Sequence, residues 1–250
     1  MRLITILLAI ASSTVNANPS LHELGIKYNT DKIYHHGYDR FYTMFFDKNI
    51  DSLLEIGIAH KNSLHLWLEY FPKAFIYGID INVQDSGNRY KIFKADQSEI
   101  NDLSKVSKQI NKKVDIIIDD GSHIPEHQLL SFNYLFNNLL KDGGVYIIED
   151  IECGYWKRGS LYGYSTKYGA NNKLNLINIF APILHLLNKE FINQQEKQLI
   201  IKELEKHISH NIPDYISSVT FAQNCIIIKK KTRQEHAFNN RNYLHQGKID

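Results

Sequence analysis

The chain has 250 residues, of which 43% are hydrophobic and 22% charged, and its formal net charge at pH 7 is +2. This length and apolar content can bury one sizeable core, and only 13 Gly and 5 Pro exclude a low-complexity or collagen-like chain. The small net charge favours neither anionic nor neutral substrates. We find no repeat, and we expect a single globular domain.

The first residues are typical of a secretory signal peptide. Arg2 precedes an apolar run from Leu3 to Ala11, and a polar stretch then ends in Val15-Asn-Ala17. This run is too short to cross a bilayer, so we expect no transmembrane anchor. If residues 1–17 are cleaved, the protein enters the secretory pathway or is secreted or periplasmic. If they form only a short apolar helix, it is cytoplasmic.

Strand-like and helix-like segments alternate from residue 52 onward. Apolar and β-branched runs predict strands over 52–58, 74–81, 90–95, 114–119 and 145–149. Helical spacing predicts helices over 62–71, 99–111, from Pro125 to a stop at Asp142-Gly-Gly144, and two more within 174–210.

The last predicted strands form a hairpin. Segments 217–222 and 225–230 are joined through Gln223-Asn224. The pattern predicts an α/β fold with a doubly wound, mostly parallel sheet and an antiparallel C-terminal hairpin. We assign residues 18–232 to this domain and 233–250 to a polar tail. The Lys229-Lys-Lys231 run fits a solvated surface better than a nucleic-acid site.

Two predicted strands end in acids. Val114-Asp-Ile-Ile-Ile-Asp-Asp-Gly-Ser-His123 is followed by Gly144-Val-Tyr-Ile-Ile-Glu-Asp150. Ligands bind at the carboxyl ends of strands in open α/β sheets, so these acids and His123 would share one crevice. Opposed acids repel unless a cation or proton lies between them. Plainer interpretations are that Asp119 accepts amides at the next helix start and that His123 is a satisfied loop histidine.

The loop after the first strand bears on the cofactor. Glu55-Ile-Gly-Ile-Ala-His-Lys61 has one glycine, whereas a dinucleotide fingerprint needs three, so NAD is disfavoured. Asp80 ends the second strand in Gly78-Ile-Asp-Ile81. A carboxylate there can accept bonds from ribose hydroxyls, although many such residues only cap a helix.

These segments together resemble a known family, the class I S-adenosylmethionine-dependent methyltransferases, and specifically the metal-dependent sugar O-methyltransferases of macrolide and rhamnosyl tailoring. The resemblance covers roughly residues 22–230. Its matching segments are Thr30-Asp-Lys32 with His36 and Tyr38, Leu54-Glu-Ile-Gly-Ile58, Ser63-Leu64 with Trp67, Tyr70-Phe-Pro72, Gly78-Ile-Asp-Ile81, Asp96-Gln97, Ile118-Asp-Asp-Gly-Ser-His123, Ser131-Phe132, and Ile148-Glu-Asp-Ile151 with Tyr155-Trp156.

The resemblance implies a Rossmann-like methyltransferase sheet and a site for S-adenosylmethionine. Glu55 and Gly57 would border the methionine part of the cofactor, Asp80 would hold the ribose, and Asp96 with Gln97 would approach the adenine. Lys61 stands where the family usually has glycine, and it would either pair with the cofactor's carboxylate or obstruct the pocket. Ala95 and Asn29 replace glycines too, and asparagine tolerates left-handed backbone angles.

The resemblance also implies a metal and a base. Asp120, Glu149 and Asp150 match the metal ligands, and His123 matches the proposed general base. Three carboxylates suit Mg²⁺ or another hard divalent cation. The metal would lower the acceptor's pKa, and His123 would take the proton.

We therefore predict an S-adenosylmethionine-dependent O-methyltransferase that acts on a sugar hydroxyl of a glycan or glycosylated small molecule. Two alternatives stay open: a secreted glycan-binding protein that has lost the cofactor through Lys61, and a metal-dependent hydroxylase. The aromatic loop of Tyr155, Trp156, Tyr162 and Tyr164 suits either a sugar ring or a lid packed on the core. The oligomeric state, including a homo-oligomer, is left open.

The two cysteines can be placed relative to each other. In this topology the last strand inserts beside the fifth and runs antiparallel to it, which would bring Cys225 near Cys153. We expect a free buried pair, with a disulfide as the alternative.

Overall fold

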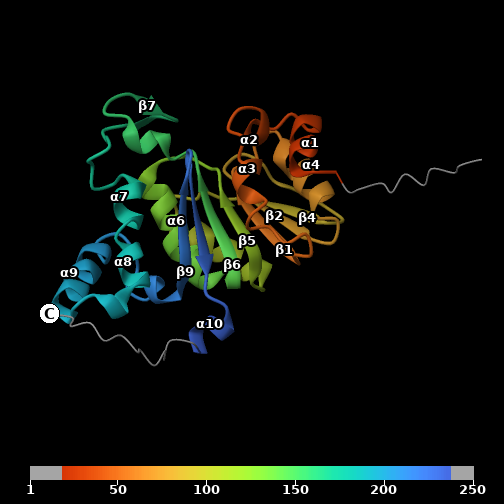
Figure 1. Ribbon diagram of the computed structural model, residues 1–250. Coiled ribbons are helices and arrows are strands. Elements are labelled where there is room, and N and C mark those ends of the chain that lie inside the picture. The colour runs from red at the N-terminus through yellow and green to blue at the C-terminus, as the bar shows by residue number, and fades with distance from the viewer. Residues whose placement is uncertain (1–18, 238–250) are drawn as a thin grey trace, which may run out of the picture.

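An eight-stranded sheet forms the centre of the part of the chain that the structure describes (Figure 1). The computed structural model describes residues 19–237, so the predicted signal peptide and most of the predicted polar tail lie outside it. The strand order is β3-β4-β2-β1-β5-β6-β10-β9. The cellular location, which was predicted from residues 1–17, stays a prediction because those residues lie outside the described range.

The five central strands are parallel and the edges are antiparallel. The parallel strands are β4 (Tyr90–Lys94), β2 (Phe75–Asp80), β1 (Ser52–Ile56), β5 (Val114–Asp119) and β6 (Leu140–Glu149). The antiparallel strands are β3 (Asp85–Gly87) at one edge, and β10 (Cys225–Lys230) and β9 (Ile216–Ala222) at the other. The predicted fold class and hairpin are confirmed, and β10 lies beside β6 as expected.

Helices cover both faces of the sheet (Figure 1). Leu53 and Ile116 face one core with α1 (Leu21–Lys27), α3 (Asp39–Tyr42) and α4 (Asn62–Tyr70). Their neighbours Leu54 and Ile117 face a second core. The helices of that second core are α5 (Ile100–Ile110), α6 (Pro125–Asn138), α7 (Leu176–Phe180), α8 (Ile183–Leu187) and α9 (Gln194–Leu204). The alternation follows from the two-residue period of a strand, and explains why both faces are apolar.

The N-terminal helices were not predicted. Ser20 accepts a bond from the backbone N–H of Glu23, and the Glu23 carboxylate accepts one from Ser20, so a capping box starts α1. The Ser-x-x-Glu spacing was a usable signal for this helix start. α2 (Asp31–Tyr34) follows, and Lys32 in it is buried.

Two predicted boundaries were wrong. α6 ends at Asn138, and β6 begins at Leu140, before the Asp142-Gly-Gly144 sequence that was assigned to a helix stop. A Cβ on Gly144 would lie 2.8 Å from the Asp115 carbonyl oxygen, so this glycine permits close approach of two strands.

The segment 174–210 contains α7, α8 and α9 with a short 3₁₀ turn, Lys189–Phe191, where two helices were predicted. Pro182 lacks the N–H that would continue α7, and Asn193 starts α9 with a second capping box. Further 3₁₀ turns are Ile151–Tyr155 and Ile212–Tyr215. The predicted tail begins with a short helix, α10 (Arg233–Ala237). Among residues 19–237, no helix has the length and apolar character of a membrane span.

Candidate active site

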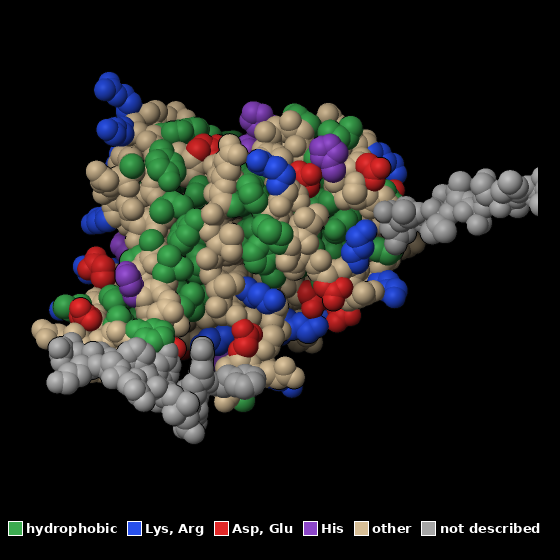
Figure 2. Space-filling model, in the orientation of Figure 1, with side chains coloured by type: hydrophobic (Ala, Val, Ile, Leu, Met, Phe, Trp, Pro, Cys, Tyr) green, Lys and Arg blue, Asp and Glu red, His purple; other side chains and the backbone are tan. Residues whose placement is uncertain are grey.

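A cavity of about 1020 Å³ opens at the carboxyl ends of the parallel strands. Its wall includes seven of the nine predicted site residues: Gly57, Asp80, Asp96, Gln97, Asp120, His123 and Asp150. The other two, Glu55 and Glu149, are buried behind it. In Figure 2, two groups of histidine side chains and a few acidic ones lie along the upper part of the molecule, to the right of its centre, where Figure 1 places α1 and α2.

Strand register brings these residues to one level. Ile56 pairs with Asp119, and Asp119 pairs with Ile148, so β1, β5 and β6 end together. Gly57 follows β1 with φ of +85°, and a Cβ there would lie 2.0 Å from the Asp120 carbonyl oxygen. Only glycine fits this close approach of two strand ends, which explains the single glycine of the first loop.

The Asp80 carboxylate is fixed by four backbone amides. Its Oδ2 accepts from Ile58 and Ala59 at 3.0 and 2.9 Å, and its Oδ1 accepts from Asn82 and Val83 at 2.7 and 2.9 Å. Partial burial raises the pKa of this carboxyl, but the four amides together lower it below its ordinary value. Asp80 is therefore an ionised acceptor on the cavity wall.

Gln97 and Asp119 form a buried network beside the cavity. Gln97 Nε2 donates to Asp119 at 3.0 Å, Ser131 Oγ donates to Asp119 at 2.8 Å, and Gln97 Oε1 accepts from the Ser122 amide at 2.6 Å. Burial raises the pKa of Asp119. Side chains supply these hydrogen bonds to Asp119, and a backbone hydrogen bond from Gly121 also lowers its pKa. The interpretation of Asp119 as an acceptor for amides before α6 therefore stays a prediction.

A buried lysine lies among three of the acids. Lys32, at the start of α2, is 2% exposed, and its Nζ lies 3.2 Å from Glu55, 2.7 Å from Glu149 and in direct contact with Asp120. Burial lowers the pKa of Lys32, but the three carboxylates outweigh it and hold the pKa well above its ordinary value. The cation that the opposed acids require is, in this structure, the Lys32 ammonium.

Glu149 faces this lysine and not the cavity. Its Oε2 accepts from Lys32, and its Oε1 accepts from the Tyr42 hydroxyl. Burial and the neighbouring Asp120 raise the pKa of Glu149 well above its ordinary value, against the opposite effect of Lys32. The prediction that Glu149 binds a metal stays a prediction.

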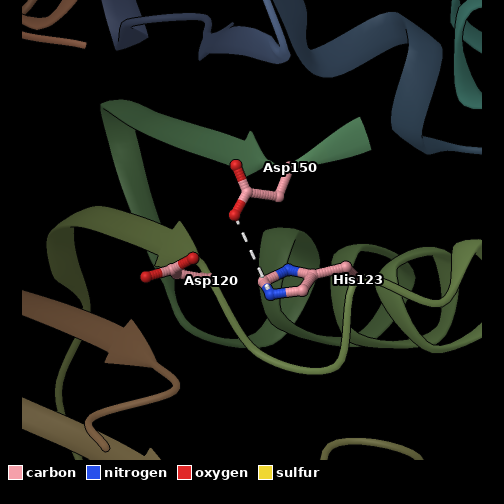
Figure 3. A group of neighbouring side chains, drawn as sticks. All are labelled: Asp120, His123 and Asp150. Carbon is pink, nitrogen blue, oxygen red and sulfur yellow. Dashed lines mark ion pairs between the residues drawn. The ribbon is translucent and has the colours of Figure 1, made fainter. Parts of the chain in front are cut away.

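Asp120, His123 and Asp150 converge on one point (Figure 3). One ligand atom from each lies within 4.8 Å of the others, and His123 Nε2 is 3.8 Å from Asp150 Oδ2. His123 has φ of +58°, and its buried Nδ1 has no hydrogen-bond partner among the described residues. Two carboxylates and an imidazole form a group that could hold a metal ion or transfer a proton.

Curated proteins of known reaction are similar to this chain. The 8-demethyl-8-alpha-L-rhamnosyl tetracenomycin-C 2'-O-methyltransferase of Streptomyces olivaceus is 32% identical over 151 residues, covering 55% of this chain and 39% of that protein. The mycinamicin VI 2''-O-methyltransferase of Micromonospora griseorubida is 32% identical over 164 residues, covering 59% and 40%. Over the matched residues the chain is similar to sugar O-methyltransferases. No family model matches it, and it spans about two fifths of the length of these relatives.

The chain also has the fold of a solved methyltransferase. MycE from the mycinamycin pathway, in complex with Mg, SAH and mycinamycin VI, superposes with a TM-score of 0.71 at 24% identity, covering 86% of this chain and 54% of that one. A second crystal form of MycE with Mg and SAH gives a TM-score of 0.68 at 25% identity. These likenesses confirm the Rossmann-like methyltransferase fold.

Lys61, which stands where the family that the sequence resembles usually has glycine, is turned to a neighbouring strand. Its backbone is left-handed, with φ of +67°, and its Nζ contacts Asp85 of β3. Lys61 is not among the residues that line the cavity. Asn29 has φ of +50°, which agrees with the tolerance expected of asparagine.

The aromatic loop divides into two parts. Tyr162 and Tyr164 lie on a small hairpin of β7 (Ser160–Leu161) and β8 (Tyr164–Ser165) and line the cavity, where the Tyr162 ring is 6.3 Å from that of His123. Tyr155 and Trp156 are exposed and do not line it.

Both cysteines are free and buried. The expectation that both thiols are free and buried is confirmed. Cys225 and Cys153 belong to different apolar clusters, and their expected proximity stays a prediction. Burial raises the pKa of Cys153 to about 11 and that of Cys225 to about 12, so neither thiol is a ready nucleophile.

Four residues that shape the site were not assigned a role from the sequence. Lys32 and Tyr38 lie in segments that carry the family resemblance, which is the only signal that could have found them. Tyr42 and Asn224 gave no signal, because their contacts with Glu149 and Asp150 join positions more than 70 residues apart.

Proposed function

We propose that the chain is an S-adenosylmethionine-dependent O-methyltransferase that methylates a sugar hydroxyl. The observation that carries the proposal is the convergence of Asp120, His123 and Asp150 in the same cavity as the Asp80 carboxylate. In the proposal these residues act as an acid–base group beside a ribose acceptor, at the edge of the sheet where ligands bind in such folds. Relatives named as sugar O-methyltransferases support the reaction class.

We assign the cofactor to the β1–β2–β4 side of the cavity. Gly57 lets the backbone approach the methionine part, and Asp96 with Gln97 borders the adenine end. Asp80 would hold the ribose, although its two oxygens already accept four amide bonds. A ribose hydroxyl would therefore share or replace one of these donors.

The residues present fit a hard divalent cation. Asp120 and Asp150 offer carboxylate oxygens within reach of one another. Glu149 would serve as a third ligand by exchanging its bond with Lys32 or Tyr42. When bound, the cation would lower the pKa of the acceptor hydroxyl.

His123 is the proton acceptor of the proposal. Methyl transfer breaks the sulfonium S–C bond, forms a C–O bond, and leaves the hydroxyl proton to a base. Asp150 Oδ2, 3.8 Å from His123 Nε2, would stabilise the imidazolium that results.

Aromatic side chains at the cavity mouth support a sugar acceptor. Tyr34 and Tyr162 are 58% and 68% exposed, and both line the cavity with Tyr164. Exposed aromatic faces beside the base suit the C–H face of a pyranose ring.

Calorimetric titration of S-adenosylmethionine into the protein tests the cofactor assignment. We expect saturable binding that Asp80→Ala abolishes. Lys61→Gly should bind as the wild type does, because the Lys61 ammonium pairs with Asp85 outside the cavity lining. No binding by a folded wild-type sample, with or without Mg²⁺, would overturn the proposal. Saccharide binding under those conditions would favour the non-catalytic glycan-binding alternative.

A separate variant tests the chemistry. Asp120→Asn should retain S-adenosylmethionine binding but lose at least about 100-fold in methyl transfer, since it removes a charged ligand from the group. Incorporation of labelled methyl into methyl α-L-rhamnopyranoside and related glycosides gives the rate. Equal turnover of variant and wild type would exclude the metal-assisted mechanism.

A further inference from the structure

We propose that Asn224, at the tip of the C-terminal hairpin, is a positioning residue that, with Tyr38, aims the Asp150 carboxylate at the metal and base site. This inference rests on the proposed function, because it concerns the same carboxylate. It makes the antiparallel hairpin, which lies outside the parallel strands, part of the active site.

The strand register puts Asn224 beside Asp150. Cys225 pairs with Glu149 across β10 and β6, so the residue before one lies next to the residue after the other. Asn224 Nδ2 donates to Asp150 Oδ1 at 2.9 Å, and Asn224 Oδ1 accepts from the Glu152 amide at 3.0 Å. One side chain therefore holds both the carboxylate and the backbone that follows it.

Asp150 needs such support because its backbone is unusual. Its φ of +50° turns the chain out of β6 into the 3₁₀ turn Ile151–Tyr155. The Ile151 amide donates to the Asn224 carbonyl at 3.3 Å, which ties this turn to the hairpin. Left-handed positions persist where surrounding contacts determine them, as here.

The two donors act on the same oxygen. The Tyr38 hydroxyl donates to Asp150 Oδ1 at 2.5 Å, and Asn224 Nδ2 donates to the same atom. Asp150 Oδ2 is left to face His123 (Figure 3). Fixing one oxygen by hydrogen bonds fixes the direction of the other, which is how outer residues orient metal ligands.

Neighbouring side chains also fix the positions of Tyr38 and of the hairpin tip. The Tyr38 ring stacks between His36 and Tyr42, with centroids 5.0 and 5.6 Å away. Arg40 donates to the side chain of Gln223, the neighbour of Asn224, at 3.2 Å. The segment of α2 and α3 therefore fixes both donors.

The test measures metal binding without turnover. Titration of the protein with Mn²⁺ alone, followed by the EPR signal of the free ion, gives the affinity of the site. Asn224→Gly keeps the left-handed turn, where Asn224 has φ of +61°, and removes both side-chain bonds. We expect about 10-fold to 100-fold weaker Mn²⁺ binding for this variant and for Tyr38→Phe. The double variant should lose less than the product of the two, because both donors serve one oxygen.

Asn111→Gly is the matched control. Asn111 is also left-handed, with φ of +51°, but it follows α5 before β5, at the opposite end of the strands from the site. It should bind Mn²⁺ as the wild type does. Folded Asn224→Gly and Tyr38→Phe proteins that both bind Mn²⁺ within twofold of wild type would overturn the inference while leaving the proposed function intact. A wild type that binds no Mn²⁺ would overturn this inference and the metal-assisted mechanism, and S-adenosylmethionine titration would still test the methyltransferase proposal.

Discussion

At the scale of the residue, Lys32 compensates the charges of three carboxylates that lie close together. Its ammonium contacts Glu55, Asp120 and Glu149, and both Lys32 and Glu149 are almost fully buried. Removing one member of a buried ionic group leaves charges without compensation. We therefore predict that Lys32→Met lowers the free energy of unfolding by about 3–5 kcal/mol at pH 7, measured by urea denaturation.

Lys61→Met is the matched control for that substitution. Lys61 pairs with Asp85, but both side chains are about a third exposed. Solvent screens exposed ion pairs, so this variant should lose far less stability than Lys32→Met does. Equal losses in the two variants would contradict the central role of Lys32.

At the scale of secondary-structure elements, the sequence predicts the strands well and the shortest helices not at all. The strand over 114–119 was predicted with the bounds that the structure shows, because its run of β-branched residues favours a strand over a helix. The N-terminal helices α2 and α3, of four residues each, are too short for periodicity to detect. The acids at the ends of β5 and β6 were predicted to meet. The partners of Glu149 and Asp150 were not, because Tyr42, Tyr38 and Asn224 reach them only through tertiary folding.

Helix α6 carries a histidine whose pKa depends on folding. Burial lowers the pKa of half-buried His127, against the opposite effects of Asp96 and Glu126. The unfolded state, with a histidine pKa near ~6.5, then binds more protons than the folded state as the pH falls. The contribution of His127 to stability is therefore complete above ~6.5 and declines as the pH falls toward the lower folded pKa.

We predict that urea midpoints fall between pH 7.5 and 5.5, and that His127→Gln makes this fall smaller. His207, whose pKa is also lowered by burial, should retain part of the slope. His210→Gln should not make the fall smaller, because the neighbouring Glu205 raises the pKa of His210, which is the opposite effect. An unchanged slope in His127→Gln would show that His127 titrates alike in both states.

At the scale of the whole molecule, three helices supply the groups that compensate the buried acids of the site. The acids behind the cavity are compensated from within, by Lys32 on α2, Tyr42 on α3 and Ser63 on α4. These three helices cover one face of the sheet, so their packing and the ionic balance of the site depend on each other. The fold should therefore not require a cation, unlike small domains in which metal binding supplies the folding free energy.

Metal removal tests this separation of fold and site. The EDTA-treated protein should keep its far-ultraviolet circular dichroism and unfold cooperatively. A ligand that binds only the folded state at 100 times its Kd adds about 2.7 kcal/mol, which for a domain of this size raises Tm by about 5–11 °C. Mg²⁺ at such excess should produce a shift of this order in the wild type and little in Asp120→Asn. An equal shift in the variant would place the cation elsewhere on the protein, and unfolding by EDTA would show that Lys32 alone cannot balance the acids.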